Sequence, residues 1–449
     1  MLDINLIRNN PETVKESQIK RGFPTEDVDK VVKLDKEWRG LKEHVDNLRA
    51  KRNRISELIN KEKKVGKNID LLLKEAKEIP QQLIQKEKLM GEKKEARDSI
   101  LKEIPNIVDK SIPVGDASHN KVIATFGKPT KHSFPSKDHA DVLEALDLLD
   151  TRKASEVAGS RFYYLKGDLV RLNFAIICFA LDFLRKQGFT LMQPPYMLRK
   201  EALEGAIPLG AFEEMIYKIE GEDLYLIGTA EHALNAYYMN QTIPVQNLPI
   251  RFAGISPCFR KEAGAHGKDT KGIFRIHQFE KIEQFIFCKP ENAWKEFDLI
   301  LKNSENLLKQ IGIPFRFVVL SSGDMGRVPT KTIDFEGWFP SQRAYRELGS
   351  CSNCLDFQAR RSNTKYQDKD ELKFVSTLNN TAIATERMMA CIVDNFQQKD
   401  GSILIPKALQ KYTGFKKIEV KKIDKKVKYK PKKEKVSNAK VSKKAKKKK

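Results

Sequence analysis

The chain has 449 residues, enough for two or three domains around a sizeable core. Its formal net charge of +23 is high for a soluble protein and points to a polyanionic partner. Much of that charge is local, because residues 416–449 hold 18 Lys against three acidic side chains. Six cysteines in so long a chain exclude a disulfide framework, and the lack of a long apolar run excludes a membrane-spanning helix.

The first residues, MLDINLIRNNPETVKES, contain Asp3, Glu12 and Glu16 and no apolar core of a signal peptide. This pattern argues against a secretory signal and a mitochondrial transit peptide, so we expect a cytoplasmic protein. Cys351 and Cys354 form a single C-x-x-C. No second such pair and no H-x-x-x-H completes a zinc set, so we expect no structural zinc.

Two long, highly charged helices are predicted between residues 27 and 104. In the first, apolar residues recur at alternating spacings of three and four, broken only by Arg52, which is typical of a coiled-coil seam. The seam consists of Val31, Leu34, Trp38, Leu41, Val45, Leu48, Ile55 and Ile59. Gly66 marks the turn. The return helix is less regular, and Pro80 should kink it or mark a restart. Its apolar positions are Leu72, Ala76, Ile79, Leu83, Met90, Ile100 and Ile104, with Lys86, Lys93 and Arg97 between them.

A helical hairpin of this size would be roughly 50 to 60 Å long and too thin to bury a core of its own. We therefore expect an arm that projects from a body. On periodicity alone, a coiled coil that dimerises or acts as a spacer is the commoner case, and this alternative stays open.

From about residue 121 to 415, short β-like runs alternate with amphipathic helices, as at 169–186 and 291–311. This favours an α+β body over a regular βαβ repeat. Neither G-x-G-x-x-G after a strand nor G-x-x-x-x-G-K-[ST] occurs, so neither common parallel-sheet nucleotide fold is indicated. Residues 416–449 are nearly all Lys, Val, Ser and Ala, and we predict that they are disordered.

The segment PCFRKEAGAHGKDTKGIFRIHQFEKIEQF, residues 257–285, is the strongest candidate for a site. Residues 252–259 and 273–287 are expected to pair as antiparallel strands, with residues 264–272 as the loop. The pair would gather charged groups and a ring around one pocket: Arg260, Glu262, Arg275, Phe279 and Glu283. Arginine forks grip phosphate or carboxylate oxygens, and an aromatic face can stack on a base. A hairpin with a merely salt-bridged face is the alternative.

Four further segments accompany this hairpin. They are GFTLMQPPYML at 188–198, GTAEHAL at 228–234, YRELGSCSNCLDFQARR at 345–361, and TLNNTAIATERMMACIVDNFQ at 377–397, read as a polar turn feeding a helix. Together the five segments resemble the class II aminoacyl-tRNA synthetases, and specifically the seryl-tRNA synthetases. The resemblance covers nearly the whole chain, and the lysine-rich tail resembles the eukaryotic cytosolic branch.

The resemblance implies an α+β fold, in which helices flank an antiparallel sheet whose open face carries the site. It implies three parts: a tRNA-binding domain at 1–115 with the arm, a class II catalytic domain at 116–415, and the tail at 416–449. The segment at 188–198 matches the motif that builds a homodimer interface around a proline, here Pro195. The arm and the basic tail are then expected to bind tRNA(Ser), and whether tRNA(Sec) is also a substrate stays open.

The implied activity joins L-serine to ATP and then to tRNA. Arg260 is expected to bridge the serine carboxylate and the α-phosphate, which stabilises the charge that develops there. Arg387 would contact the γ-phosphate and cover the adenine, with Phe279 stacked on the other side. Glu262 would accept from the adenine amino group, and Arg275 would reach the γ-phosphate.

The resemblance also implies a small polar pocket for serine, in which Arg260 takes part. Glu283 and Thr381 would hold the hydroxyl, Thr229 and Glu231 the amino group, and Asn379 would line the same site. Such a pocket rejects an analogue that lacks the hydroxyl, because its buried polar groups are then left unpaired. No catalytic role is assigned to three histidines: His232, His266 and His277.

Glu347 and Ser350 are expected as oxygen ligands of the Mg²⁺ that accompanies ATP. Two residues depart from the family pattern. Glu386 stands where a small or neutral residue is usual, directly before Arg387, and it would either pair with that arginine and loosen its hold on ATP or face solvent. Asn380 replaces a small residue.

Two other functions are weaker. A non-catalytic tRNA-binding paralogue is disfavoured because Arg260, Glu262, Glu347 and Arg387 are all present. A ligase that activates serine or a related amino acid for a carrier protein is disfavoured because such relatives lack the long arm.

Overall fold

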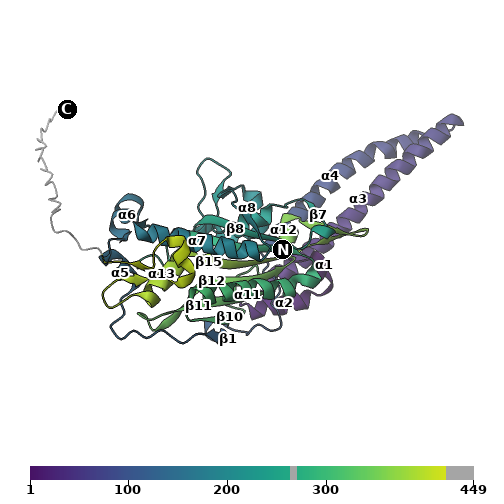
Figure 1. Ribbon diagram of the computed structural model, residues 1–449. Helices are drawn as coiled ribbons and strands as arrows, with labels where there is room; N and C mark the ends of the chain where they lie inside the picture. Colours follow the sequence, from purple (N-terminus) through teal and green to yellow (C-terminus); the bar gives the residue numbers. More distant parts are fainter. Residues whose placement is uncertain (263–270, 421–449) are drawn as a thin grey trace, which may run out of the picture.

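The computed structural model describes residues 1–262 and 271–420, and it shows a body from which a long helical arm projects (Figure 1). The body is built on one eight-stranded sheet, in which every neighbouring pair is antiparallel except the edge strand β4, which runs parallel to β8. This confirms the predicted α+β class. In spatial order the strands are β1 (Lys121–Phe126), β10 (Phe315–Val319), β11 (Lys331–Phe339), β12 (Ala344–Leu355), β15 (Ser376–Ala384), β9 (Gln278–Cys288), β8 (Ile250–Phe259) and β4 (Thr190–Met192).

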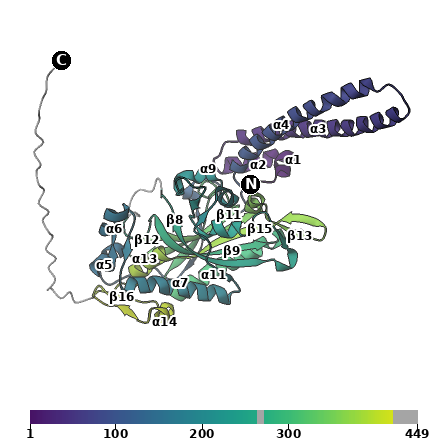
Figure 2. The same cartoon turned by 90° about the horizontal axis from the view of Figure 1, so that it is seen from above.

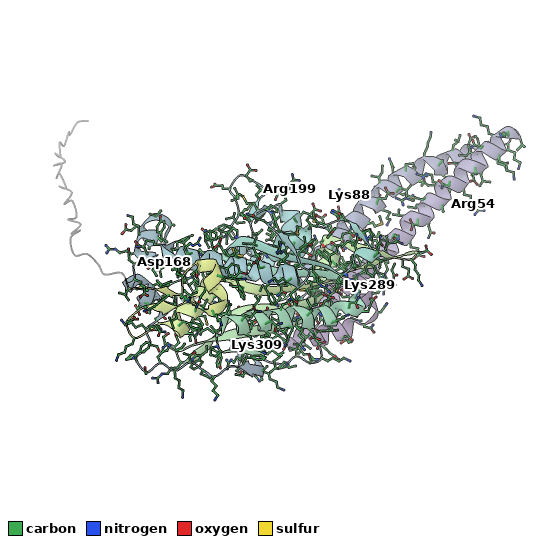
Figure 3. The ribbon with its side chains drawn as sticks, in the orientation of Figure 1. Arg54, Lys88, Asp168, Arg199, Lys289 and Lys309 are labelled. Carbon is green, nitrogen blue, oxygen red and sulfur yellow. The ribbon has the colours of Figure 1, made fainter. Side chains whose placement is uncertain are left out.

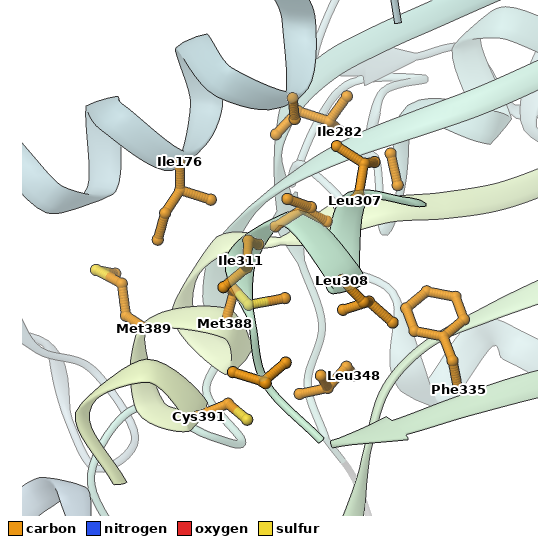
Figure 4. Close-up of a cluster of buried hydrophobic side chains, with 14 of the residues drawn as sticks. Ile176, Ile282, Leu307, Leu308, Ile311, Phe335, Leu348, Met388, Met389 and Cys391 are labelled. Carbon is orange, nitrogen blue, oxygen red and sulfur yellow. The ribbon is translucent and has the colours of Figure 1, made fainter. Parts of the chain in front are cut away.

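Three amphipathic helices cover one face of the sheet and close the main core. They are α7 (Asp168–Lys186), α11 (Ala293–Ile311) and α13 (Thr385–Phe396). Ile176 of α7, Leu307 of α11 and Met388 of α13 lie in one buried cluster with Ile282 of β9 and Leu348 of β12 (Figure 4). The two amphipathic helices expected in the body are confirmed as α7 and α11.

The opposite face of the sheet carries shorter helices. Leu234 of α10 packs in a cluster with Phe252 and Phe285. Gly254 of β8 permits this close approach, since a Cβ there would lie 2.8 Å from Leu234. Near α10 (Ala230–Ala236) lie α8 (Lys200–Ala206) and α12 (Phe357–Ser362). The other short helices of the described body are α5 (His139–Ala145), which packs against α13, α14 (Gln410–Thr413), which packs against α7, and α6 (Thr151–Ala158) and α9 (Leu209–Phe212).

Four small sheets complete the body. A three-stranded one joins β14 (Glu371–Phe374), β13 (Lys365–Asp368) and β7 (Thr242–Pro244). Three two-stranded ones pair β2 (Leu149–Asp150) with β3 (Tyr164–Leu165), β5 (Met197–Leu198) with β6 (Tyr225–Leu226), and β16 (Ile403–Leu404) with β17 (Lys417–Ile418).

The arm is an antiparallel hairpin of two helices, which Figure 2 shows extending away from the sheet. They are α3 (Glu26–Lys64) and α4 (Asp70–Glu103), and α1 (Ile4–Asn9) and α2 (Pro11–Lys20) precede them. The predicted seam is confirmed, because Val45 and Ile55 are buried against Ile79 and Leu83 in a cluster of the arm's own. Gly66 makes the turn at φ 67°. Of the two outcomes expected at Pro80, a restart is wrong, because α4 runs through it.

One buried carboxylate ties the root of the arm together. Asp35 of α3 is 1% exposed and accepts hydrogen bonds from Arg8 of α1 (2.9 Å), from Arg39 (3.0 Å) and from Arg97 of α4 (2.9 Å). The Arg97 guanidinium also lies 4.8 Å from the centre of the Trp38 ring. Burial alone would raise the pKa of Asp35, but its three arginine partners outweigh burial and hold that pKa below its usual value. Arg97, which interrupts the apolar series of the return helix, therefore has a structural role: it neutralises Asp35 at the root of the arm.

Two boundaries predicted for the site's strands are wrong. β9 begins at Gln278 and not at residue 273, because Ile273 and Ile276 turn into the core and the Ile273 N–H donates to His139 Nε2 (3.3 Å). The turn expected at the start of 377–397 is instead strand β15, buried along its whole length. Most of its polar side chains are hydrogen-bonded, as Asn380 Nδ2 is to Ser304 Oγ (2.8 Å), and this makes their burial tolerable.

The predicted start of the tail at residue 416 is also wrong. Lys417 and Ile418 form β17, and Ile418 is 1% exposed, so the folded body continues past 416. The disorder predicted for the rest of the tail concerns residues 421–449, which lie outside the described residues.

Candidate active site

A cavity of about 190 Å³ opens on the face of the sheet opposite α7 and α11. It is lined by residues of β9, β12 and β15, by the segments after β8 and before β9, and by the first turns of α10 and α13. The structure brings all of the sequence-predicted site residues into its wall: Thr229, Glu231, Arg260, Glu262, Arg275, Phe279, Glu283, Glu347, Ser350, Asn379, Thr381 and Arg387.

Strand alternation explains why β9 supplies so much of the wall. Phe279, Lys281 and Glu283 are two residues apart and therefore point to the same face, while Ile282 points to the core. The Arg260 guanidinium lies 5.2 Å from the centre of the Phe279 ring, and its Nε donates to the Gly228 carbonyl (3.1 Å). The arginine is thus held over an aromatic face at the floor of the cavity.

A second arginine of the cavity wall, Arg275, is paired with a glutamate. Arg275 Nε lies 3.5 Å from Glu262 Oε2. Glu262 has a positive φ of 46°, a conformation that L-residues seldom adopt, and the Arg161 guanidinium donates to its carbonyl (2.9 Å). The turn is therefore braced by its neighbours at the point where it meets the cavity.

Four buried polar side chains of the cavity wall contact one another. The Thr229 hydroxyl donates to Glu283 Oε2 (3.3 Å), and Glu283 pairs with Lys281. The Lys281 ammonium also donates to Thr381 Oγ1 (3.5 Å). Sequence reasoning missed Lys281, although its place midway between Phe279 and Glu283 on one strand was a usable signal.

Glu231 lies in the first turn of α10, whose N-cap is Thr229. Its Oε1 accepts hydrogen bonds from Gln358 Nε2 (2.7 Å) and Asn379 Nδ2 (3.0 Å). Burial and the neighbouring Glu283 raise the pKa of Glu231 to about 7. A cationic ligand group beside this carboxyl would favour its ionised form, so the site is suited to an ammonium.

Arg387 also lines the cavity and is paired with a carboxylate. Its guanidinium donates to Glu347 Oε1 (2.8 Å), and this contact with Arg387 holds the pKa of Glu347 below its usual value. Ser350 lies opposite Asp334 in the β11–β12 ladder. Asp334 Oδ1 is buried without a hydrogen-bond partner among the described residues. Anionic and hydroxyl oxygens so placed fit a hard cation whose remaining ligands come from a bound phosphate.

Both expectations for Glu386 are wrong, because it neither pairs with Arg387 nor faces solvent. It is 1% exposed and turned away from the arginine. The Tyr163 hydroxyl donates to its Oε1 (2.5 Å), and the Glu280 N–H and the Thr385 hydroxyl donate to its Oε2 (both 2.9 Å). Glu386 therefore links the start of α13 to β9, and Arg387 pairs with Glu347 instead of with Glu386.

The pH dependence of the folding stability should reflect the burial of Glu386. Burial raises its pKa to about 7 against an ordinary 4.5, so the folded chain holds a proton that the unfolded chain loses across that interval. Stability from this group is therefore lost as pH rises from about 4.5 to 7. Glu386→Gln should remove this loss. Between the two pH values, the free energy of unfolding of the variant should therefore rise relative to that of the parent by up to about 3 kcal/mol. Urea unfolding at several pH values measures this, and parallel pH curves for the two proteins would contradict it.

Two of the three histidines without an assigned catalytic role, His232 and His277, neighbour cavity-lining residues: His232 follows Glu231 in α10, and His277 contacts Arg260. Burial lowers the pKa of His232 to about 3, which leaves a neutral ring. His277 Nδ1 is 2.8 Å from the Arg260 carbonyl, and the Arg260 N–H donates to the His277 carbonyl (2.9 Å), a reciprocal brace at the end of β8. The third histidine, His266, lies outside the described residues.

Comparison with known proteins decides the family. Residues 1–108 match the model of the seryl-tRNA synthetase N-terminal domain, and residues 215–396 match that of the class II tRNA synthetase core domain for G, H, P, S and T. The serine–tRNA ligase of Nitrosopumilus maritimus is 45% identical over 92% of this chain and 99% of its own. The chain belongs to the seryl-tRNA synthetase family.

Solved structures agree with this membership. Seryl-tRNA synthetase from Pyrococcus horikoshii, crystallised with ATP, superposes with a TM-score of 0.89 at 44% identity and covers 93% of this chain and 99% of its own. Cytoplasmic serine–tRNA ligase from Naegleria fowleri, solved with AMP, gives 0.84 at 39% identity, with coverages of 94% and 99%. One of these relatives is archaeal and one eukaryotic, so the eukaryotic cytosolic subtype stays a prediction.

The cysteines and the helices complete the description. Cys351 and Cys354 lie in separate apolar clusters, and among the described residues no three His, Cys, Asp or Glu side chains are grouped to hold a metal ion. Within the described ranges, no helix is both long and apolar enough to cross a bilayer.

Proposed function

We propose that this protein activates L-serine with ATP and transfers it to tRNA(Ser), as a serine–tRNA ligase of class II. One observation carries the proposal: a single cavity holds an arginine over an aromatic ring, a second arginine beside a carboxylate, and a cluster of buried polar side chains that includes the Glu231 carboxyl. Family membership over nearly the whole chain supports it.

The proposed chemistry is an in-line attack of the serine carboxylate on the α-phosphorus of ATP, with release of pyrophosphate. The attacking group is already an anion, so the step needs charge neutralisation and alignment rather than a general base. Arg260 bridges the serine carboxylate and the α-phosphate. Arg387 and Arg275 bind the γ-phosphate, Phe279 and Arg387 enclose the adenine, and Glu262 accepts from its amino group. Held there by Glu347 and Ser350, Mg²⁺ would neutralise phosphate charge.

In the proposed serine subsite, Thr229 and Glu231 take the amino group and Asn379 lines the wall. Glu283 and Thr381 take the hydroxyl, and Lys281 keeps both acceptors in place through its ion pair and hydrogen bond. Gly349 packs closely against Thr381, since a Cβ at 349 would lie 2.8 Å from the Thr381 Cβ. This close packing keeps the proposed subsite small.

Serine selectivity tests this subsite. In Thr381→Val and Glu283→Gln, kcat/KM for serine in ATP–pyrophosphate exchange should fall relative to that for alanine, by about tenfold or more, because a buried hydroxyl then lacks a partner. Glu296→Gln, which alters a buried carboxylate paired with Arg251 instead, is the matched control. An unchanged serine-to-alanine ratio in both subsite variants would show that the hydroxyl is bound elsewhere.

The proposed assembly is a cytoplasmic homodimer formed along β4. Pro195 follows this edge strand and is exposed, as are Leu191 (39%) and Met197 (47%). The proposed tRNA contacts lie on the arm, where Arg54 and Lys88 point into solvent (Figure 3). The division into domains at 1–115 and 116–415 remains part of this proposal.

Serine-dependent ATP–pyrophosphate exchange and serylation of purified tRNA together test the function. Both activities are expected. Exchange without serylation would indicate activation for another acceptor, and neither activity would indicate the non-catalytic paralogue.

The basic tail should add a general attraction for RNA. Removing residues 421–449, which leaves β17 intact, should keep exchange unchanged and raise the KM for tRNA mainly at low salt, because lysine–phosphate contacts are screened by salt. The measurement is the KM for tRNA at two salt concentrations. A truncated protein with the parental KM and salt dependence would remove the tail from RNA binding.

A further inference from the structure

Behind the cavity wall, one buried amide holds the ammonium-binding carboxyl. Gln358 of α12 is 0% exposed. The Thr377 hydroxyl donates to Gln358 Oε1 (2.6 Å), and Gln358 Nε2 donates to Glu231 Oε1 (2.7 Å). Nε2 also donates to the Ala206 carbonyl (3.3 Å). A flipped amide would place its oxygen against Glu231 Oε1 and the Ala206 carbonyl, so these two acceptors set its orientation and the Thr377 hydroxyl serves as the donor to Oε1.

The donors converge on one oxygen. Asn379 Nδ2 donates to the same Glu231 Oε1 (3.0 Å). Among the described residues, no side chain donates to Oε2, so this oxygen is free for a ligand. Two amides thus orient the carboxyl through one oxygen, and Glu231 itself lines the cavity.

Charged groups around Glu231 come from β9 and from the segment after β8. On β9, Glu283 disfavours its ionised form and Lys281 favours it, and Arg260 after β8 also favours it. Cys354 of β12 is buried, and Glu231 helps to raise the pKa of that thiol, which stays neutral. Gln358 and Asn379 are uncharged and donate directly to Glu231, so they stabilise the carboxylate without forming an ion pair with it.

Helix α12 is itself fixed from the far side. Arg361 donates to three carbonyls, those of Lys102 at the end of α4 (2.7 Å), Glu204 (2.6 Å) and Ile207 (2.7 Å). Arg360 pairs with Asp3 (2.9 Å). A helix of six residues that is held in this way gives Gln358 little freedom to move.

We propose that Gln358 is a positioning residue for serine binding, which keeps Glu231 ionised and directs its free oxygen at the serine ammonium. This rests on the proposed function. Gln358 does not line the cavity, so it acts through Glu231 and not by touching the substrate.

The test is Gln358→Leu, assayed by serine-dependent ATP–pyrophosphate exchange from pH 6 to 9. The expected result is a KM for serine raised ~10-fold at pH 7, with the KM for ATP within about twofold, because one charge-assisted donor is lost. The acid-side decline in serine affinity should also move up by about one pH unit, since the carboxyl that loses a donor is harder to ionise.

Two further variants separate positioning from general damage. Gln284→Leu is the matched control, because Gln284 is also 0% exposed and bonded to a carbonyl and a side chain but faces the core. It should lose stability without moving the pH profile. Thr377→Val keeps Gln358 but removes the donor that holds its Oε1, and it should shift the serine KM in the same direction by a smaller factor, even if Gln358→Leu does not fold.

The outcomes are distinct. Unchanged serine KM and pH profiles in Gln358→Leu and Thr377→Val overturn the proposal. Equal rises in the KM values for serine and ATP also overturn it, because they show general loss of the site. A parent protein without serine-dependent exchange overturns the proposed function instead.

Discussion

Arg260→Ala should lower serine-dependent ATP–pyrophosphate exchange by about 10²–10³ in kcat while the protein stays folded. The guanidinium lies over Phe279 in the cavity and belongs to none of the apolar clusters, so its loss removes a preorganised cation and leaves the core intact. Because the proposed contacts strengthen as charge moves to the α-phosphate, most of the loss should appear in kcat rather than in KM.

Two controls accompany this variant. Arg260→Lys keeps the charge but not the two-pronged donor, and it should recover only part of the activity. Arg152→Ala changes an arginine whose side chain is 93% exposed, and it should be neutral. Exchange within about threefold of the parent in Arg260→Ala would contradict the assignment.

Shortening the arm should abolish tRNA charging while exchange continues. The structure shows where to cut: residues 45–90 contain the arm's own apolar cluster, while Asp35 and Arg97 at the root lie outside that range. Replacing 45–90 by a short Gly/Ser linker removes the exposed cations Arg54, Lys61, Lys63 and Lys64, none of which is ion-paired within the described residues. Phosphate contacts from such side chains position RNA, so kcat/KM for tRNA should fall by about 10² or more.

The readouts are serylation, exchange and the molecular mass in solution. Exchange and dimerisation should match the parent. If charging persisted near the parental kcat/KM, or if the shortened protein became a monomer, the arm would be an assembly element, which is the alternative that its heptads left open.

The sequence predicted more of the site than of its surroundings. Residues such as Arg260, Glu283 and Arg387 were recognisable because each lies in a segment with a strong family pattern, and all three line the cavity. Strand β15 was misread because TLNNT is polar. A polar run can form a central strand when side chains from other elements accept its hydrogen bonds. Here Gln358 accepts from Thr377, and Ser304 accepts from Asn380.

The roles of Glu386 and Lys281 show the same limit. A carboxylate beside an arginine in sequence suggests a pair, but a helix turns successive side chains about 100° apart, and Tyr163, more than 200 residues away, takes the carboxylate. Lys281 could have been placed from alternation alone. What alternation cannot supply is that Glu283 and Thr381, from two strands, both meet its ammonium.

The root of the arm sets a rule for building chimeras. Arg361 holds the end of α4 through the carbonyl of Lys102, a group that every residue offers, so this contact places no demand on the sequence of the arm. Asp35 instead requires particular guanidiniums, and one of them, Arg8, belongs to α1 and not to the hairpin. A transplanted arm that leaves its own first helix behind would carry a buried, under-compensated carboxylate into its new host. The exchangeable unit is therefore the hairpin together with α1.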